Sequence, residues 1–242
     1  MTERTLLGVL TPSSNTVLEP LTAEILHELP DVSAHFGRLR VTEISLRDQA
    51  LSQFDNEPFL AAASMLADAR VQSITWSGTS AGWRGFQDDI ALCEAIQAET
   101  GIAATTSVLA LNEIFEKTGV KNFGLVTPYL DDVQEKIVEN YREAGFNCVA
   151  ERHLGDKGNF SFSEYGEDCI AEMVRAVAAE GKVDAITIFC TNLRGPRVAA
   201  ELEKELGIPI YDTIATGVWK GMRLAGADTS RIKGWGSVFE LK

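Results

Sequence analysis

Hydrophobic and polar positions along the chain follow two alternating patterns. Short apolar runs rich in β-branched residues are typical of buried parallel strands, and longer segments with apolar residues three or four positions apart are typical of amphipathic helices. The clearest strand, residues 183–190, ends abruptly in Cys190, and the small polar residues Thr191 and Asn192 follow it. An open α/β sheet places its chemistry at such strand ends.

The alternation of these patterns predicts eight strands, at residues 5–10, 33–41, 71–78, 101–106, 122–126, 146–152, 183–190 and 207–212. A helix is expected after each strand, at residues 17–29, 56–69, 88–100, 107–117, 133–141, 163–180, 196–206 and 213–225. Residues 78–87, 43–56 and 155–163 are expected to form loops, and residues 235–242 could return as an extra strand.

Three stretches of the first half recur in the same order in the second half. Residues 8–12 resemble 124–128, residues 71–80 resemble 183–192, and residues 101–102 resemble 207–208. In the second of these pairs Gly78 falls at the position of Cys190. Chance similarity between buried strands is the alternative, but the shared order favours duplication of a βαβ unit.

Strands that alternate with helices imply parallel sheets with right-handed crossovers. The sequence therefore predicts an α/β fold of two pseudo-symmetric halves, each a four-stranded parallel sheet flanked by helices, with the active site in the crevice between them. The first half is expected at residues 1–112, completed by about residues 213–242, and the second at residues 113–212.

Composition and charge narrow the class of partner. The chain has 242 residues, a net charge of −13, and an ordinary share of hydrophobic residues, 45%. We expect no nucleic-acid partner, because phosphate binding needs a basic surface. No run reaches the ~18 apolar residues of a membrane span, and no signal-peptide pattern precedes the first strand, so we expect no membrane partner and a cytoplasmic protein.

The four cysteines are Cys93, Cys148, Cys169 and Cys190, and none forms a C-x-x-C pair or lies beside a histidine. This spacing predicts no zinc or other metal site. The first three fit helix or strand interiors and are expected to be inert core residues. Cys190 differs because polar residues follow it at once, although a buried strand-end thiol without chemistry is the alternative.

Four motifs resemble the aspartate/glutamate racemase superfamily, in the branch of the maleate cis-trans isomerases and arylmalonate decarboxylases. The loop motif Pro12-Ser13-Ser14-Asn15-Thr16 is similar to the maleate isomerases, and Gly78-Thr79-Ser80 with Trp83-Arg84-Gly85 is similar to the decarboxylases. Thr127-Pro128-Tyr129 and Cys190-Thr191-Asn192 complete the set. The resemblance covers essentially the whole chain.

The resemblance implies chemistry with a single thiol. Racemases of this superfamily place one cysteine from each half on opposite faces of the substrate, whereas this chain resembles the decarboxylases in having Gly78 in the first half and Cys190 in the second. It therefore implies a cofactor-independent decarboxylase of a malonate-like small carboxylic acid, in which Cys190 protonates an enediolate. The residues it places around the substrate are Pro12, Ser14, Asn15, Gly78, Thr79, Ser80, Tyr129, Asn159 and Thr191.

Other readings remain open at this point. The isomerase-type loop and Asn159 fit a small dicarboxylic acid, so a maleate-isomerase-like or single-base isomerase or racemase is one alternative, and a carboxylate-binding protein without activity is another. Asn15 could cap the helix that begins near Val17, hold a substrate carboxylate, or do both. By resemblance, we also expect a homo-oligomer, a dimer or larger.

Overall fold

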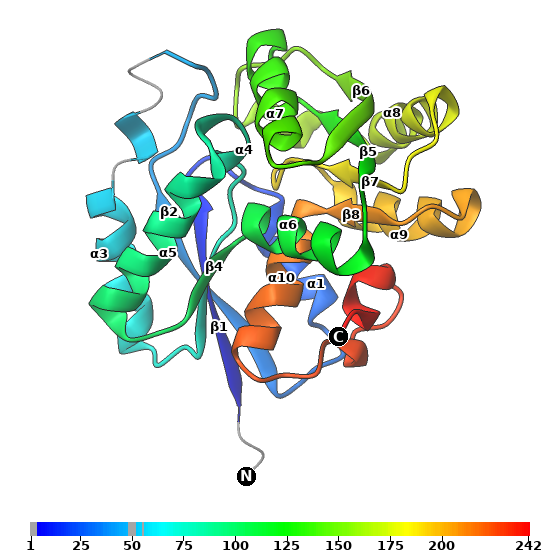
Figure 1. Cartoon of the computed structure of the whole chain (residues 1–242). Helices are drawn as coiled ribbons and strands as arrows, with labels where there is room; N and C mark the ends of the chain where they lie inside the picture. Colours follow the sequence, from blue (N-terminus) through cyan, green and yellow to red (C-terminus); the bar gives the residue numbers. More distant parts are fainter. Residues whose placement is uncertain (1–3, 48–51, 55) are drawn as a thin grey trace.

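The first sheet is built from four parallel strands and lies at the lower left of Figure 1. The computed structural model describes residues 4–47, 52–54 and 56–242. Within these ranges the sheet contains β1 (Thr5–Pro12), β2 (Val32–Leu39), β3 (Ser73–Trp76) and β4 (Ala104–Thr106). Their spatial order is β2-β1-β3-β4, and every neighbouring pair is parallel.

The second sheet, at the upper right of Figure 1, repeats this plan. Its strands are β5 (Asn122–Thr127), β6 (Asn147–His153), β7 (Ala185–Ile188) and β8 (Ile210–Asp212), in the order β6-β5-β7-β8 and again parallel. The four residues of β7 are all buried, as expected for a strand covered on both faces. The predicted α/β fold with two four-stranded parallel sheets is confirmed.

Helices cover both sheets. Those of the first half are α1 (Leu18–Ile25), α3 (Asn56–Asp68), α4 (Ala81–Arg84), α5 (Phe86–Thr100) and α6 (Ser107–Thr118). Those of the second are α7 (Asp131–Glu143), α8 (Glu167–Glu180), α9 (Gly195–Leu206) and α10 (Thr213–Leu224). No helix in the described ranges is long and apolar enough to cross a membrane.

Helix α10 joins the two halves. It begins directly after β8 of the second sheet but packs against α6 and against β3 of the first sheet. Two glycines allow this close approach: a Cβ at Gly217 would lie 2.8 Å from the Ser107 hydroxyl, and one at Gly221 would lie 2.9 Å from the Thr75 hydroxyl. The division of the chain near residues 112 and 212 stays a prediction.

Three expected elements are corrected. The helix expected from residue 163 begins at Glu167, after a separate 3₁₀ turn, Ser161–Glu164. The loop expected at residues 78–87 contains the short helix α4. Residues 235–242 do not add a strand, because Ser237–Glu240 forms a 3₁₀ turn and the carbonyl of Leu241 accepts a bond from the Trp219 indole of α10. Part of the expected loop at residues 43–56 lies outside the described residues.

Candidate active site

The site is organised by loops that follow the two central strands of each sheet, β1 and β3 in one and β5 and β7 in the other. Direct hydrogen bonds join these loops across the halves. Asn15, after β1, donates to the carbonyl of Thr191, after β7, at 3.0 Å. The Thr191 hydroxyl in turn donates to the carbonyl of Ser77, after β3, at 3.0 Å. The carboxyl ends of the strands therefore meet, as the sequence pattern predicts.

Cys190 lies buried at this meeting point, with 3% of its surface exposed. The backbone N–H of Asn192 lies 3.4 Å from its sulfur, and the Leu193 N–H and the Tyr129 hydroxyl also bond to it. Burial raises the pKa of the Cys190 thiol to about 12, although these three donors oppose the shift. The thiol is therefore protonated at neutral pH, a state suited to donating a proton.

Tyr129 connects the thiol to the first half. Its hydroxyl oxygen lies 2.6 Å from the hydroxyl of Thr79, and its ring packs edge-on against Trp83 and Phe162. Burial, followed by the charge of Cys190, raises the pKa of Tyr129 well above its ordinary value. The neutral Tyr129 hydroxyl therefore lies beside the sulfur, with the Thr79 hydroxyl next to it, and such groups can donate to an oxyanion without prior loss of a proton.

Asn15 caps the helix that follows it. Its side-chain oxygen accepts from the N–H groups of Val17, at 3.0 Å, and Leu18, at 2.9 Å, while the carbonyl of Pro12 accepts from its backbone N–H at 3.0 Å. The side-chain amide nitrogen makes the bond to Thr191 described above. The capping hypothesis is thus confirmed, and both polar atoms of Asn15 have partners within the protein.

Ser14 and Asn159 also lie together, although 145 positions separate them. The Asn159 amide donates to the Ser14 hydroxyl at 2.9 Å, and that hydroxyl donates to the carbonyl of Val41 at 2.8 Å. Asn192, the last residue of the Cys190-Thr191-Asn192 motif, links this pair to the start of α1. Its amide donates to the carbonyl of Asn159 at 2.5 Å, and its oxygen accepts from the Thr16 N–H at 3.0 Å.

The first-half strand end differs from the second in shape as well as chemistry. A Cβ built on Gly78 would lie 2.1 Å from the indole ring of Trp76, so the ring packs directly on this glycine. Ser80, two residues on, lies on the wall of a cavity of ≈170 Å³ that Phe59 and Leu92 also line, between α3 and α5. Ser80 thus borders the outer helix layer as well as the strand ends.

Asp212 is a buried carboxylate near the thiol that sequence reasoning missed. One oxygen caps α10 by accepting from the N–H groups of Ile214, at 2.7 Å, and Ala215. The other oxygen packs against Gly195 and finds no hydrogen-bond partner within the described part of the chain. Burial raises the pKa of Asp212 to about 8. Its position as the last residue of the eighth predicted strand was the available signal.

The donors that gather here are hydroxyls, carboxamides, a thiol and backbone N–H groups, which are suited to a carboxylate or an oxyanion. Across residues 4–47, 52–54 and 56–242, no three histidine, cysteine, aspartate or glutamate side chains group in a way that could hold a metal ion. The arrangement can therefore bind an organic acid through neutral donors and present a thiol proton to it.

Known enzymes resemble this chain in sequence and in structure. The arylmalonate decarboxylase of Bordetella bronchiseptica is 26% identical over 236 residues, covering 97% of this chain and 96% of that protein. A maleate isomerase of Nocardia farcinica is 27% identical over 230 residues, covering 90% and 88%. The structure of unliganded arylmalonate decarboxylase matches with a TM-score of 0.80 at 25% identity, covering 99% of this chain and 100% of that one.

The maleate isomerase Iso from Pseudomonas putida S16 has the same fold, with a TM-score of 0.86 at 20% identity over 98% of both chains. The sequence model of the arylmalonate decarboxylase family matches residues 20–239. The chain therefore belongs to the arylmalonate decarboxylase family, in the enzyme branch of the aspartate/glutamate racemase superfamily that also contains the maleate isomerases.

Proposed function

We propose that this protein is a cofactor-independent decarboxylase of a malonate-like acid and that Cys190 protonates the intermediate. The observation that carries the proposal is the inequality of the two strand ends. Of the four cysteines, all within the described ranges, only Cys190 is buried at the junction of the halves. The equivalent first-half position is Gly78, and the indole of Trp76 fills the space a side chain would need.

The proposed reaction needs one proton, delivered to one face of a planar enediolate intermediate. The bond from the α-carbon to one carboxyl breaks, carbon dioxide leaves, and the electron pair of that bond passes into an enediolate of the remaining carboxyl. The Thr79 hydroxyl can turn from Tyr129 to donate to an enediolate oxygen, while the single O–H proton of Tyr129 stays in the bond to the Cys190 sulfur. The α-carbon then takes the proton of the Cys190 thiol.

The thiolate that remains after proton transfer is already contacted by hydrogen-bond donors. The N–H groups of Asn192 and Leu193 and the Tyr129 hydroxyl already bond to the sulfur. They stabilise the anion until a proton from solvent restores the thiol and completes the cycle. Because burial keeps the thiol protonated at neutral pH, Cys190 is better suited to this step than to nucleophilic attack.

A maleate-isomerase-like activity is the second candidate, and the Pro12–Thr16 loop together with the fold match favours it. One solved maleate isomerase mutant, 22% identical to this chain, carries a covalently bound succinylcysteine intermediate. Covalent isomerisation on the first-half strand end of this chain would need a nucleophile other than a thiol at Gly78. A carboxylate-binding protein without turnover is the third candidate.

Turnover of three acids separates these candidates. The purified protein is incubated with phenylmalonate, methylmalonate and maleate, while carbon dioxide release and double-bond absorbance are followed. We expect carbon dioxide from a malonate and no loss of maleate absorbance. Maleate turnover without carbon dioxide release would favour the isomerase, and saturable binding without any turnover would favour the binding protein.

The variant Cys190→Ala tests the role of the thiol. We expect it to lower kcat by about 10²-fold or more, because it removes the proton donor. The matched control is Cys169→Ala, a partly exposed thiol of α8 for which we expect unchanged kinetics. If Cys190→Ala kept kcat within a few-fold of the parent while decarboxylation was observed, the thiol would not be the donor.

A further inference from the structure

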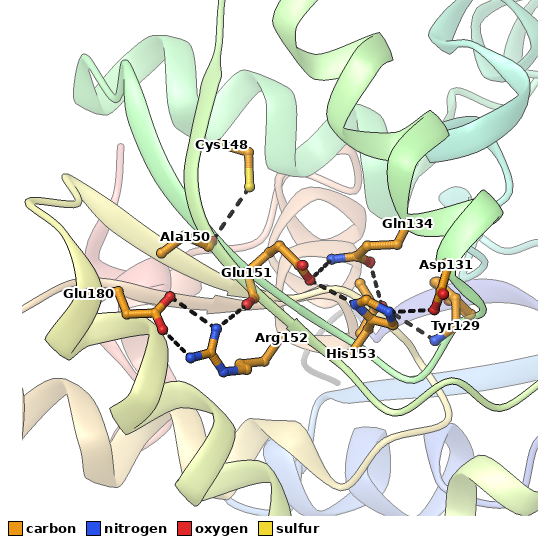
Figure 2. Close-up of polar contacts among 10 residues, drawn as sticks. Tyr129, Asp131, Gln134, Cys148, Ala150, Glu151, Arg152, His153 and Glu180 are labelled. Atoms are coloured by element: carbon orange, nitrogen blue, oxygen red, sulfur yellow. Dashed lines mark hydrogen bonds and ion pairs between the residues drawn. The ribbon is translucent and has the colours of Figure 1, made fainter.

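A chain of hydrogen bonds runs from the segment that carries Tyr129 to the surface of the second half (Figure 2). The buried Thr127 hydroxyl donates to the side-chain oxygen of Gln134 at 2.6 Å. The Gln134 amide donates to the carboxylate of Glu151 at 2.8 Å, and the same carboxylate oxygen lies 2.8 Å from Nδ1 of His153. The other ring nitrogen of His153, Nε2, lies 2.9 Å from the carboxylate of Asp131.

The carboxylate of Glu151 determines which group donates and which accepts in each hydrogen bond of this chain. A carboxylate only accepts, so the Gln134 side chain must turn its NH₂ group to Glu151 and its oxygen to Thr127. The Thr127 hydroxyl must then donate to Gln134, which leaves its oxygen to accept the backbone N–H of Tyr129, 3.3 Å away. Thr127 and Gln134 are both buried, so little water competes for these bonds.

His153 closes the outer end of the chain. Both of its ring nitrogens face carboxylate oxygens, and only the doubly protonated imidazolium can donate from both. Burial lowers the pKa of His153, but its hydrogen bonds to Glu151 and Asp131 outweigh burial and raise the pKa above its ordinary value. The other charged groups around the groove of ≈780 Å³ that His153 lines are Asp132, Glu135, Lys136, Glu139 and Arg142.

His153 also links α7 to β6, beside the segment from Thr127 to Asp131 that carries Tyr129 (the Tyr129 segment). Asp131, at the end of this segment, begins α7, and Glu151 lies on β6. Backbone bonds run in parallel, from the N–H groups of Gly155 and Asp156 to the carbonyls of Tyr129, at 3.1 Å, and Pro128, at 2.8 Å. These backbone bonds do not depend on pH, whereas the imidazolium of His153 can lose its charge near neutral pH.

We propose that doubly protonated His153 is a positioning residue for the active site. By holding Asp131 and Glu151 it fixes the segment from Thr127 to Asp131, and with it the Tyr129 hydroxyl against Thr79 and Cys190. His153 itself does not reach the reacting atoms and acts through Glu151, Gln134 and Thr127. The consequence for catalysis rests on the proposed function, whereas the positioning of Tyr129 does not.

Loss of the second proton would weaken this connection. A neutral imidazole donates from one nitrogen only, so its other nitrogen would face a carboxylate oxygen with no hydrogen between them. One of the two bonds then fails, and the Glu151 end of the chain or the start of α7 is released. We therefore expect Tyr129 to be held less firmly as pH rises through the pKa of His153.

The matched control comes from the next residue along β6. Arg152 points to the other side of the strand in Figure 2 and pairs with Glu180. Like the pair of His153 with Glu151, this ion pair is partly exposed, but it faces α8 and not the Tyr129 segment. The variant Glu180→Gln therefore removes a surface pair of similar kind while leaving the chain from His153 to Thr127 intact.

Hydrogen exchange of the Tyr129 amide tests the positioning without any substrate. It is measured by NMR in ¹⁵N-labelled wild type, His153→Gln and Glu180→Gln between about pH 5.5 and 8.5 and corrected for the intrinsic rate, a range that spans histidine titration. In wild type we expect protection to fall by about fivefold as pH rises. In His153→Gln we expect it to be low and independent of pH, and in Glu180→Gln to match wild type.

Kinetics with a malonate then tests the consequence for catalysis. We expect kcat of wild type to decline at alkaline pH, and we expect His153→Gln to lower kcat by about fivefold at pH 6, with little change in KM, and to show no such decline. Exchange and a pH profile like those of wild type in His153→Gln would overturn the inference. If wild type turned over no acid, the proposed function would fail, while amide exchange would still decide whether His153 positions Tyr129.

Discussion

At the scale of single residues, Trp76 determines how much chemistry the first half can hold. Its indole packs on the Cα of Gly78 and edge-on against Phe59 at 4.8 Å between ring centroids. A second thiol at position 78 is what two-sided proton transfer would require, since a donor and an acceptor are needed on opposite faces. The one-sided character of the site therefore depends on a core aromatic residue as well as on the glycine.

The pair Gly78 and Trp76 yields the first prediction. The variant Gly78→Cys alone should lose about 1–3 kcal/mol of stability, because its Cβ meets the indole at 2.1 Å and the ring must move. Combined with Trp76→Leu, which vacates that space, the new thiol should reach the substrate. A prochiral disubstituted malonate should then give product of both hands, measured by chiral chromatography.

Trp76→Leu alone is the control for this experiment, and it should keep a single-enantiomer product. Denaturant unfolding of all three variants measures the stability change. A Gly78→Cys variant as stable as wild type would show that the indole yields easily. A folded double variant that still gave one enantiomer would count against the two strand ends facing one substrate.

Asp212 gives the second prediction, which concerns pH. Its pKa is about 3.9 in the unfolded chain and about 8 in the folded protein, where burial disfavours the charged form. Between these values the folded protein holds a proton that the unfolded chain releases. The contribution of Asp212 to stability therefore falls as pH rises from about 4 to about 8, by up to about 1.4 kcal/mol per pH unit.

The variant Asp212→Ser isolates this contribution. Serine still caps the first turn of α10, and it removes the carboxyl oxygen that has no partner among the described residues. The Tm of the variant relative to wild type should therefore increase with pH across this window and level off above about pH 8. A Tm difference that did not change with pH would show that Asp212 is already charged in the folded protein.

At the scale of elements, the loops after β1 and β7 hold each other in place. The Asn192 side chain donates to Asn159 and accepts from the N–H groups of Thr16 and Val17, which lie at the start of α1. One carboxamide thus satisfies a helix start in the first half and a loop in the second. Removing it leaves these backbone groups without that partner.

The third prediction tests this connection. Asn192→Ala should lower the free energy of unfolding by about 2–4 kcal/mol, since three hydrogen bonds are lost, two of them buried, and the buried partners remain desolvated. The control is Asn147→Ala, whose side chain bonds to Asn122 on the surface and should cost less than about 0.5 kcal/mol. Urea denaturation measures both. A loss from Asn192→Ala no larger than that of the control would show that water replaces these bonds.

The sequence predicted elements where periodicity and end signals agree. The eight strands and the starts of α6 and α10 follow from apolar runs and from the capping residues Thr106 and Asp212, and Gly101 and Gly207 end α5 and α9 in left-handed conformations. Helix α4 was missed because four residues show no period. The apolar residues near the end of the chain fit both a strand and a packed turn, and the turn is what forms.

At the scale of the whole molecule, symmetry was predictable and the long-range contacts of the site were not. The duplication indicated which strand ends would meet. It did not indicate that Asn15 would bond to Thr191, 176 positions away, or that Trp76 would cover Gly78. These contacts depend on how two halves dock and which rotamers fill the junction, and neither leaves a periodic signal in the sequence.

The net charge of −13 acts on every anionic ligand that approaches. Three surface arginines, Arg38, Arg84 and Arg197, are paired with Glu19, Asp88 and Glu24 and are therefore not free to hold an anionic ligand. The negative field of the protein therefore repels an approaching dicarboxylate. At the site, the neutral hydrogen-bond donors of the strand ends would bind it. Salt screens this field over a Debye length of about 10 Å at 0.1 M, so it should weaken the repulsion.

The fourth prediction follows from this field and concerns KM. Raising the salt concentration from about 20 to about 200 mM should lower KM for a malonate dianion by about two- to threefold, because more substrate reaches the site. The kcat value should change little, since Cys190 and Tyr129 are buried and bulk ions screen buried groups weakly. Sucrose at equal osmolarity is the control and should leave KM unchanged. A KM that rose with salt would mean that an ion pair with a local cation dominates binding, and the assignment of substrate recognition to neutral donors would then be wrong.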